Sequence, residues 1–259
     1  MELKKLKYVY GPVASWRLGN SLGIDPVFKG RKVCNFDCVY CQIGRTGLLT
    51  NQRHLLVPCD EVIGEMKLLS EVPKIDYITF SGAGEPTLAA NLGNMIKAVR
   101  TLRPEKIAVI TNSSLINDEE VRKDLSLADF VLAKLDAPDQ GIFERINRPV
   151  KSVRFDDIIS GLRSFRAMCK GKLALQMMFM DANKGTASEM ARIAREIDPH
   201  EVQINTPLRG GQVKPLSETD IARIEKHFEG LNIVSVYKAE RKKTVPVSAP
   251  ETLKRRGKI

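Results

Sequence analysis

The chain has 259 residues, of which 43% are hydrophobic and 28% charged, and this composition excludes a mainly disordered protein. No apolar run approaches the length of a membrane span and no apolar signal-peptide core follows the N-terminus, so we expect a cytoplasmic protein without a membrane partner. The net charge of +10 favours polyanionic partners such as RNA, an acidic electron carrier or a phosphorylated small molecule, although a soluble basic face gives the same charge.

Short β-rich runs alternate with amphipathic stretches along the chain, which predicts a parallel sheet with crossover helices. The predicted strands lie just before Cys34 and at Ile75–Phe80, Lys106–Ile110, Asp129–Leu135, Leu173–Met180 and Glu201–Asn205, with Leu231–Tyr237 as a late edge strand. The predicted helices are Glu61–Leu69, Leu88–Thr101, Asp118–Leu125, Arg154–Cys169, Thr186–Glu196 and Glu218–Phe228, with Asp60, Asn117 and Ser217 as entry residues for three of them. About six βα units, short of a full eight-unit barrel, predict an α/β fold with a partial (β/α)6 TIM-like barrel.

The last stretch of the chain has weak periodicity and many basic residues. We therefore predict a barrel with an N-terminal extension over residues 1–237 and a basic C-terminal tail over residues 238–259. This tail is either mobile or packed across the barrel. Ligands of such folds gather at the carboxyl ends of the strands, so the binding residues are expected in the loops that follow the strands.

Three of the five cysteines lie in one loop, Cys34-Asn-Phe-Asp-Cys38-Val-Tyr-Cys41. In a reducing compartment this favours metal ligation over disulfides. Three thiolates can hold three irons of a [4Fe–4S] cluster and leave the fourth iron open to a substrate. A zinc or electron-transfer site that takes His54 or Cys59 as a fourth ligand is the alternative, although zinc sites usually use two separated pairs of ligands.

The spacing of the three cysteines, with Tyr40 before the last one, resembles the signature of the radical S-adenosylmethionine (SAM) superfamily. The resemblance implies a barrel of the radical SAM type and a [4Fe–4S] cluster held by Cys34, Cys38 and Cys41. It also implies that the open iron binds SAM, which is cleaved reductively to a 5′-deoxyadenosyl radical that abstracts hydrogen from a substrate. A flavodoxin or ferredoxin is the expected electron donor, because no flavin- or nicotinamide-binding glycine motif follows a strand.

The loop Ser81-Gly82-Ala83-Gly84-Glu85-Pro86 follows a predicted strand and resembles the glycine-rich motif of the superfamily. Glycines allow a ligand to approach the backbone closely. The resemblance implies that Gly82, Gly84 and Glu85 bind SAM, with Glu85 near the methionine amino group. Tyr40 is included among the cofactor-binding residues. A simple turn is the alternative for the glycine-rich loop.

Further candidate SAM contacts follow the next strands. By position in the superfamily, Asn112 and Asp136 are the candidates for the carboxylate and ribose contacts, with a helix cap and a strand-end ion pair as the alternatives. Gln176, Gln203 and Asn205 lie in runs that should line the barrel interior, where buried polar side chains need partners. Bound adenosine or substrate would supply such partners, and an internal hydrogen-bonded layer is the alternative.

Other stretches resemble a largely uncharacterised group of small archaeal and bacterial radical SAM proteins related to the wyosine-forming tRNA enzymes. These stretches are Tyr10–Val13, Arg17–Pro26, Gly84–Thr87, Lys134–Asp136 and Arg145–Pro149. Wyosine-forming enzymes hold a second cluster with three cysteines N-terminal to the first set, and this chain has no cysteine before Cys34. A second cluster is therefore not expected, and the wyosine reaction does not carry over. Cys59 and Cys169 are expected to be packed side chains.

Three functions remain open. RNA modification is favoured by the net charge, the basic tail and the loop residues Arg145, Arg148 and Arg209. A radical SAM enzyme that acts on a small metabolite or a peptide is favoured by the small size and the lack of a recognisable RNA-binding module. A non-enzymatic iron–sulfur carrier or sensor is the third, and the polar residues predicted around the open iron argue against it. Arg17 is either an anion contact or a structural cap.

Overall fold

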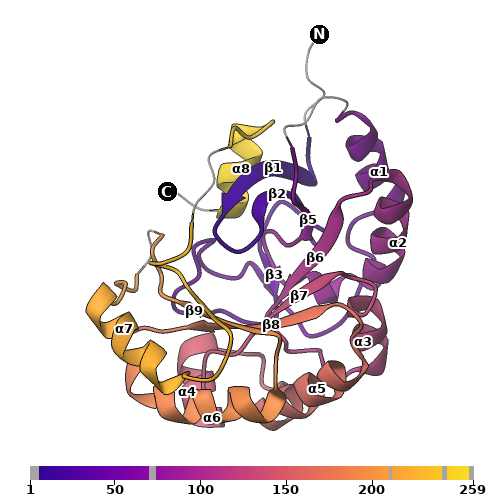
Figure 1. Ribbon diagram of the computed structural model, residues 1–259. Helices are drawn as coiled ribbons and strands as arrows, with labels where there is room; N and C mark the ends of the chain where they lie inside the picture. Colours follow the sequence, from indigo (N-terminus) through magenta and orange to yellow (C-terminus); the bar gives the residue numbers. More distant parts are fainter. Residues whose placement is uncertain (1–5, 70–73, 210–211, 241–243, 257–259) are drawn as a thin grey trace.

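A computed structural model describes residues 6–69, 74–209, 212–240 and 244–256 of the chain, and its centre is an eight-stranded sheet (Figure 1). The strand order is β1-β2-β5-β6-β7-β8-β9-β10, in which β1 and β2 form an antiparallel hairpin and the strands from β2 onwards are parallel. The strands are β1 Val9–Ser15, β2 Gly19–Ile24, β5 Tyr77–Phe80, β6 Lys106–Thr111, β7 Phe130–Lys134, β8 Lys172–Met178, β9 Glu201–Asn205 and β10 Ile233–Ser235. A separate ladder joins β3 Val33–Cys34 to β4 Leu48–Leu49.

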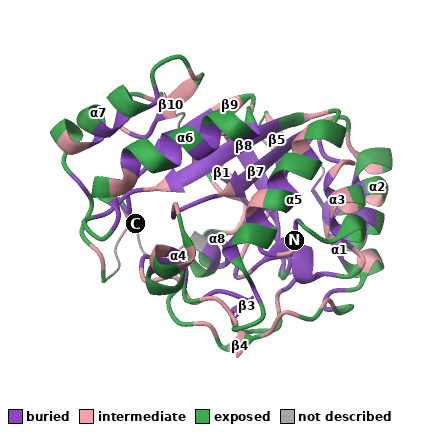
Figure 2. Ribbon diagram, turned by 90° about the horizontal axis from the view of Figure 1, so that it is seen from below, coloured by how far each residue is buried: buried purple, intermediate pink, exposed green. Residues whose placement is uncertain are grey.

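Helices follow the strands and lie around the outer side of the curled sheet, as Figure 1 shows for α1, α2, α3, α5 and α6. The helices are α1 Cys59–Lys67, α2 Leu92–Leu102, α3 Glu119–Leu125, α4 Gln140–Asn147, α5 Phe155–Met168, α6 Ala187–Ile197, α7 Glu218–His227 and α8 Ala249–Arg256, with 3-10 turns at Pro86–Leu88 and Lys184–Thr186. Their inward faces are buried and their outward faces exposed (Figure 2). Among the described residues, no helix has the length and apolar character needed to cross a membrane.

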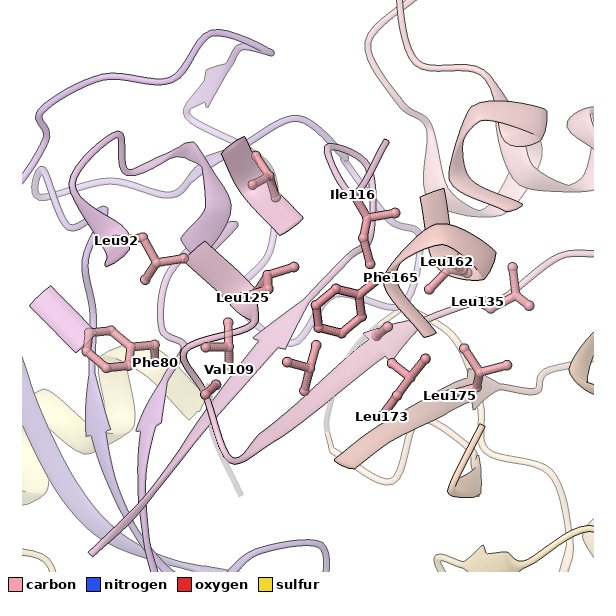
Figure 3. Packing of buried hydrophobic residues seen from close by; sticks show 14 of the residues in the cluster. Phe80, Leu92, Val109, Ile116, Leu125, Leu135, Leu162, Phe165, Leu173 and Leu175 are labelled. Carbon is pink, nitrogen blue, oxygen red and sulfur yellow. The ribbon is translucent and has the colours of Figure 1, made fainter. Parts of the chain in front are cut away.

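The two faces of the sheet have different surroundings because successive side chains of a strand point to opposite faces. One face packs under the helices, where Phe80, Val109, Leu125 and Phe165 belong to one large core cluster (Figure 3). The other face carries polar side chains such as Gln176, and a second, smaller cluster joins Ala108, Leu132 and Ala174 to Leu18 of the hairpin. The inner face is therefore only partly filled.

The curled, largely parallel sheet agrees with the predicted partial barrel. The prediction of a barrel strand just before Cys34 is wrong. The strand found there, β3, pairs with β4 outside the main sheet, and β2 is the strand that pairs with β5. The hairpin partner β1 was not predicted. Of the entry residues, Ser217 caps its helix through its hydroxyl, whereas Asp118 rather than Asn117 caps α3.

The described part of the basic C-terminal tail packs on the barrel. Helix α8 lies against β1, and Figure 1 shows the two side by side. The backbone N–H of Gly11 donates to Thr252 Oγ1 at 3.0 Å. The guanidinium of Arg255 is fully buried and pairs with Asp25 and Glu251. This part of the tail therefore belongs to the packed structure, and Arg255 presents no charge to solvent.

Candidate functional site

The cysteine loop and the glycine-rich loop are hydrogen-bonded to each other. The N–H of Val33 donates to the carbonyl of Ala83 at 3.1 Å, and the N–H of Glu85 donates to the carbonyl of Val33 at 3.0 Å. A Cβ atom on Gly84 would lie 1.8 Å from the Val33 carbonyl oxygen, so only glycine allows this approach. The two loops that the sequence singled out thus form one unit beside β5.

Each of the three cysteines has a polar or charged neighbour from the chain. Asn112 Nδ2 lies 3.7 Å from the sulfur of Cys34, and Asn147 Nδ2 lies 3.5 Å from the sulfur of Cys38, both as hydrogen-bond donors. The third neighbour is Lys32, which is buried beside Cys41 and donates to the carbonyl of Gly44 at 2.9 Å. Two amides and one ammonium group therefore surround the three thiols.

Burial of the Cys34 and Cys38 thiols disfavours their ionised form. Burial raises the pKa of the Cys34 thiol to about 12, and the nearby Cys38 and Glu85 contribute to the shift. Burial also raises the pKa of Cys38. Burial alone would lower the pKa of Lys32, but attraction to Cys41 and Cys34 once these thiols ionise raises it overall. The Cys34 and Cys38 thiols hold their protons until iron displaces them, so cluster assembly releases protons.

The donor set fits a cluster with one open iron, since the loop offers three thiols with compensating donors around them. Within the described ranges, no group of three or more Cys, His, Asp or Glu side chains is arranged to hold a single metal ion. The candidate fourth ligands lie on other segments. His54 pairs through its backbone with Ala89, and Cys59 is the first residue of α1.

Asp136 joins several of the predicted site residues in one buried network. Its carboxylate accepts hydrogen bonds from Tyr40 Oη, from Asn147 Nδ2 at 2.9 Å and from the N–H of Met178 at 2.9 Å. Lys134 Nζ lies 3.7 Å from the same carboxylate and 4.5 Å from the centre of the Tyr40 ring. Burial and the charge of Asp136 raise the pKa of Tyr40 well above its usual value, so Tyr40 stays protonated as a donor.

Glu85 is buried, and its carboxylate is engaged by the ends of neighbouring strands. It accepts from the N–H and hydroxyl of Thr87, from Thr111 Oγ1 at 2.7 Å and from the N–H of Asn112 at 2.6 Å. Burial raises the pKa of Glu85, and these hydrogen bonds oppose the shift. The carboxylate clamps the glycine-rich loop to the end of β6. Asn112 continues this network by donating to Asn35 Oδ1 at 2.7 Å.

A cavity of about 410 Å³ opens beside these loops on the inner face of the sheet. This volume is typical of small-molecule sites. Of the predicted site residues, those that line it are Tyr40, Cys41, Gly82, Gly84, Gln176 and Asn205. Glu85, Asn112 and Asp136 do not line it and instead support its walls through the networks described above. Gln203 donates to Glu201 and accepts from Gln176 at 3.4 Å, which is the internal layer considered as an alternative.

Sequence reasoning missed several side chains of the site. Asp25 is fully buried and accepts from the N–H of Ala83 at 2.9 Å and from Arg255 Nε at 3.1 Å. A Cβ atom on Gly82 would lie 2.3 Å from the Asp25 carboxyl carbon. Asn147 and Asp25 both lie in stretches that resemble the related radical SAM proteins, and this resemblance was the sequence signal that could have indicated them. No sequence signal marked Lys32 or Arg255 as site residues, because their roles depend on tertiary packing.

Residues 31–194 match the family model described as the radical SAM superfamily. The chain is 40% identical over 204 residues to a UPF0026 protein of Synechocystis sp., which covers 78% of this chain and 76% of that protein. It is 39% identical over 225 residues to a UPF0026 protein of Methanocaldococcus jannaschii, and this match covers 84% of this chain and 68% of that protein. A more distant relative is a probable dual-specificity RNA methyltransferase RlmN of Trichormus variabilis, 23% identical over 204 residues, with 73% of this chain and 52% of that protein covered.

The fold is similar to those of solved radical SAM structures. The structure of native anSMEcpe with bound AdoMet superposes with a TM-score of 0.60 at 20% identity and covers 82% of this chain and 64% of that one. The structure of Streptococcus suis SuiB bound to S-adenosylmethionine superposes with a TM-score of 0.59 at 15% identity. The match covers 79% of this chain and 48% of SuiB, so this chain spans about half of that protein. At these identities the likeness shows the fold, which is the predicted partial barrel.

Proposed function

We propose that this chain, which belongs to the radical SAM superfamily and within it to the UPF0026 group, modifies RNA by radical chemistry. The cofactors of the superfamily are a [4Fe–4S] cluster and SAM, and the reduced cluster cleaves SAM to supply a 5′-deoxyadenosyl radical. Cys34, Cys38 and Cys41 would hold the cluster. The observation that carries the proposal is the three-cysteine loop bonded directly to the glycine-rich loop at the wall of the cavity.

The chain's own residues would position SAM and exclude water. Gly82 and Gly84 line the cavity next to the cysteine loop, and their lack of side chains lets the loop pack against Asp25 and the Val33 carbonyl. Gln176 and Asn205, from β8 and β9, are the polar lining residues that would meet the adenosine. Tyr40 lines the cavity as well, and its hydroxyl is held by Asp136. These assignments are proposals for each side chain.

RNA as the substrate is supported by charge and by one distant relative. The net charge of +10 attracts the phosphate backbone, and such binding weakens as salt rises. The relative from Trichormus variabilis is named as a probable RNA methyltransferase. We propose a flavodoxin or ferredoxin as the electron donor, because the acidic surface of such a carrier would meet this basic protein.

The direct test is anaerobic incubation of the reconstituted protein with SAM, dithionite and bulk tRNA, followed by mass spectrometry of the nucleosides. We expect a new nucleoside mass with the wild type and none with Cys38→Ala. A matched control is Cys169→Ala, which leaves the cysteine loop untouched and should keep the product. Turnover with peptides or small metabolites and none with any RNA would contradict the proposal.

A further inference from the structure

The rim of the cavity is built by two segments from opposite ends of the sheet order. The tip of the β1–β2 hairpin provides Trp16 and Arg17, and the segment after β9 provides Arg209. These three residues are half-buried, whereas lining residues such as Thr79 and Gln176 are buried. The curl of the sheet thus places an aromatic ring and two guanidinium groups around one opening.

The charge of the described lining residues is entirely positive. Four of them are cations, namely Arg17, Lys134, Arg209 and Arg255, and none is an aspartate or glutamate. Lys134 is 3.7 Å from Asp136, and Arg255 pairs with Asp25 and Glu251, so these two balance carboxylates behind the wall. Arg17 and Arg209 are the other two cations of this lining, and each of them also has a partner within the chain. A rim of this kind favours an anionic group on the molecule that enters.

Both rim arginines have defined surroundings. Arg209 Nη1 donates to Gln42 Oε1 at 2.8 Å, which fixes the guanidinium next to the cysteine loop. The guanidinium of Arg17 lies over one face of the Trp16 ring, 5.5 Å from its centre. A nucleobase would therefore stack on the opposite face of this ring, and arginine binds phosphate in a bidentate manner.

We propose that the rim formed by Trp16, Arg17 and Arg209 is the substrate-binding site of the enzyme and that it takes a phosphate-bearing nucleoside. The base stacks on Trp16, and Arg17 and Arg209 bind the phosphate. The phosphate belongs either to a free nucleotide or to RNA, since both present the same group. This inference rests on the proposed function for placing substrate at the cavity, and it adds the residues that select the substrate.

The chain contains a single tryptophan, so Trp16 reports binding without any turnover. The reconstituted holoenzyme with SAM is titrated with each common nucleoside 5′-monophosphate, with the matching nucleosides and with a short oligoribonucleotide. Tryptophan fluorescence and equilibrium dialysis measure the affinities. We expect quenching by the monophosphates at concentrations about tenfold lower than by the nucleosides. If the oligoribonucleotide binds more tightly than the monophosphates, RNA is the source of the phosphate. If it does not bind more tightly, the source is a free nucleotide.

Variants separate the two parts of the site. Arg17→Ala and Arg209→Ala should each weaken monophosphate binding about tenfold and leave nucleoside binding unchanged. Trp16→Ala should weaken the binding of monophosphates and of nucleosides to a similar degree, as measured by dialysis. Arg223→Ala is the matched control, because Arg223 is an exposed arginine of α7 that pairs with Asp220 and does not line the cavity.

The proposal is overturned if nucleosides bind as tightly as monophosphates, or if the two arginine variants behave like Arg223→Ala. SAM affinity and SAM cleavage without substrate are measured on the same variants, and Arg223→Ala should stay at the wild-type level in both. These binding measurements do not require that the protein modifies RNA. Phosphate-dependent binding to the rim without a modified nucleoside would contradict the proposed function and leave the substrate site standing.

Discussion

At the residue scale, two amides and one lysine stand next to the three thiols, and each should tune the cluster. Hydrogen bonds and positive charge near a cluster stabilise its reduced, more negative form. Asn112 and Asn147 donate to the sulfurs of Cys34 and Cys38, and Lys32 is buried beside Cys41. Glu85 plays a different part, because its carboxylate is bonded to Thr87, Thr111 and Asn112.

We predict that Lys32→Met and Asn147→Leu each lower the midpoint reduction potential of the cluster, on the order of 50 mV, since a hydrogen bond to a charged group contributes about 1.5–3 kcal/mol. A redox titration followed by electron paramagnetic resonance measures the shift at full cluster occupancy. Arg45→Met is the control, because Arg45 is an exposed cation of the same loop. Equal potentials in all of the variants would show that these neighbours serve only to pack the loop.

Glu85→Ala should destabilise the fold as well as weaken SAM binding. Several buried donors would lose their acceptor at about 1–3 kcal/mol each, so we expect a loss of about 3 kcal/mol in the free energy of unfolding. Denaturant unfolding of the apoprotein measures the loss, and isothermal titration of the holoenzyme measures SAM affinity. Lost SAM affinity at unchanged stability would instead mean that the carboxylate acts on SAM and not on the wall.

Single residues also show how far sequence reasoning reaches. The spacing of Cys34, Cys38 and Cys41 and the glycines of the next loop have local signatures, so the two loops that form the site could be found. Whether a polar side chain lines a cavity or supports its wall depends on packing among distant segments. Glu85, Asn112 and Asp136 therefore carried a signal for the candidate site without indicating what each side chain touches.

At the element scale, α8 packs against β1 and connects through Arg255 and Asp25 to the glycine-rich loop. Arg255 reaches from α8 to Asp25, which in turn accepts from the N–H of Ala83 in that loop. The Arg255 guanidinium also lies 4.2 Å from the ring of Phe28 and donates to the carbonyl of Lys7. The C-terminal helix thus supports the loop that we propose binds SAM, although α8 is far from this loop in sequence.

We predict that Arg255→Leu destabilises the protein by about 3–5 kcal/mol, because it leaves the buried Asp25 without its countercharge. It should also weaken SAM binding by loosening the Ala83 N–H contact. Lys254→Leu is the control, since its ion pair with Glu251 is half-exposed and exposed pairs contribute about 0–1 kcal/mol. Similar thermal unfolding of the two variants would reject the supporting role of α8.

Elements with strong local signals were predicted within a few residues of their observed bounds. Strand β6 and helix α6, for example, have apolar periodicity that determines their type. Hairpin β1–β2 was missed because its interior glycines and its proline weaken the strand pattern, and Gly23 is needed where the ring of Tyr10 packs. Helix α8 is so basic that its sequence reads as a tail, although packing buries Arg255.

At the scale of the whole molecule, the curled sheet brings the hairpin, the cysteine loop, the glycine-rich loop and the segment after β9 around one cavity. The cysteine loop and the wall beneath it are tied to several strands, so the cluster site and the SAM site would be assembled together. The proposed rim is basic and would select what enters. Cluster, SAM and substrate would thus be bound at neighbouring parts of one site.

We expect this chain to cleave SAM reductively on a cluster held by the cysteine loop. The measurement is anaerobic reconstitution followed by mass spectrometry of 5′-deoxyadenosine, with SAM and dithionite, for the wild type and for Cys38→Ala. We predict 5′-deoxyadenosine from the wild type and none from the variant. A wild-type cluster that is fully formed yet never cleaves SAM, with or without RNA or nucleotides present, would contradict the account and favour an iron–sulfur carrier or sensor.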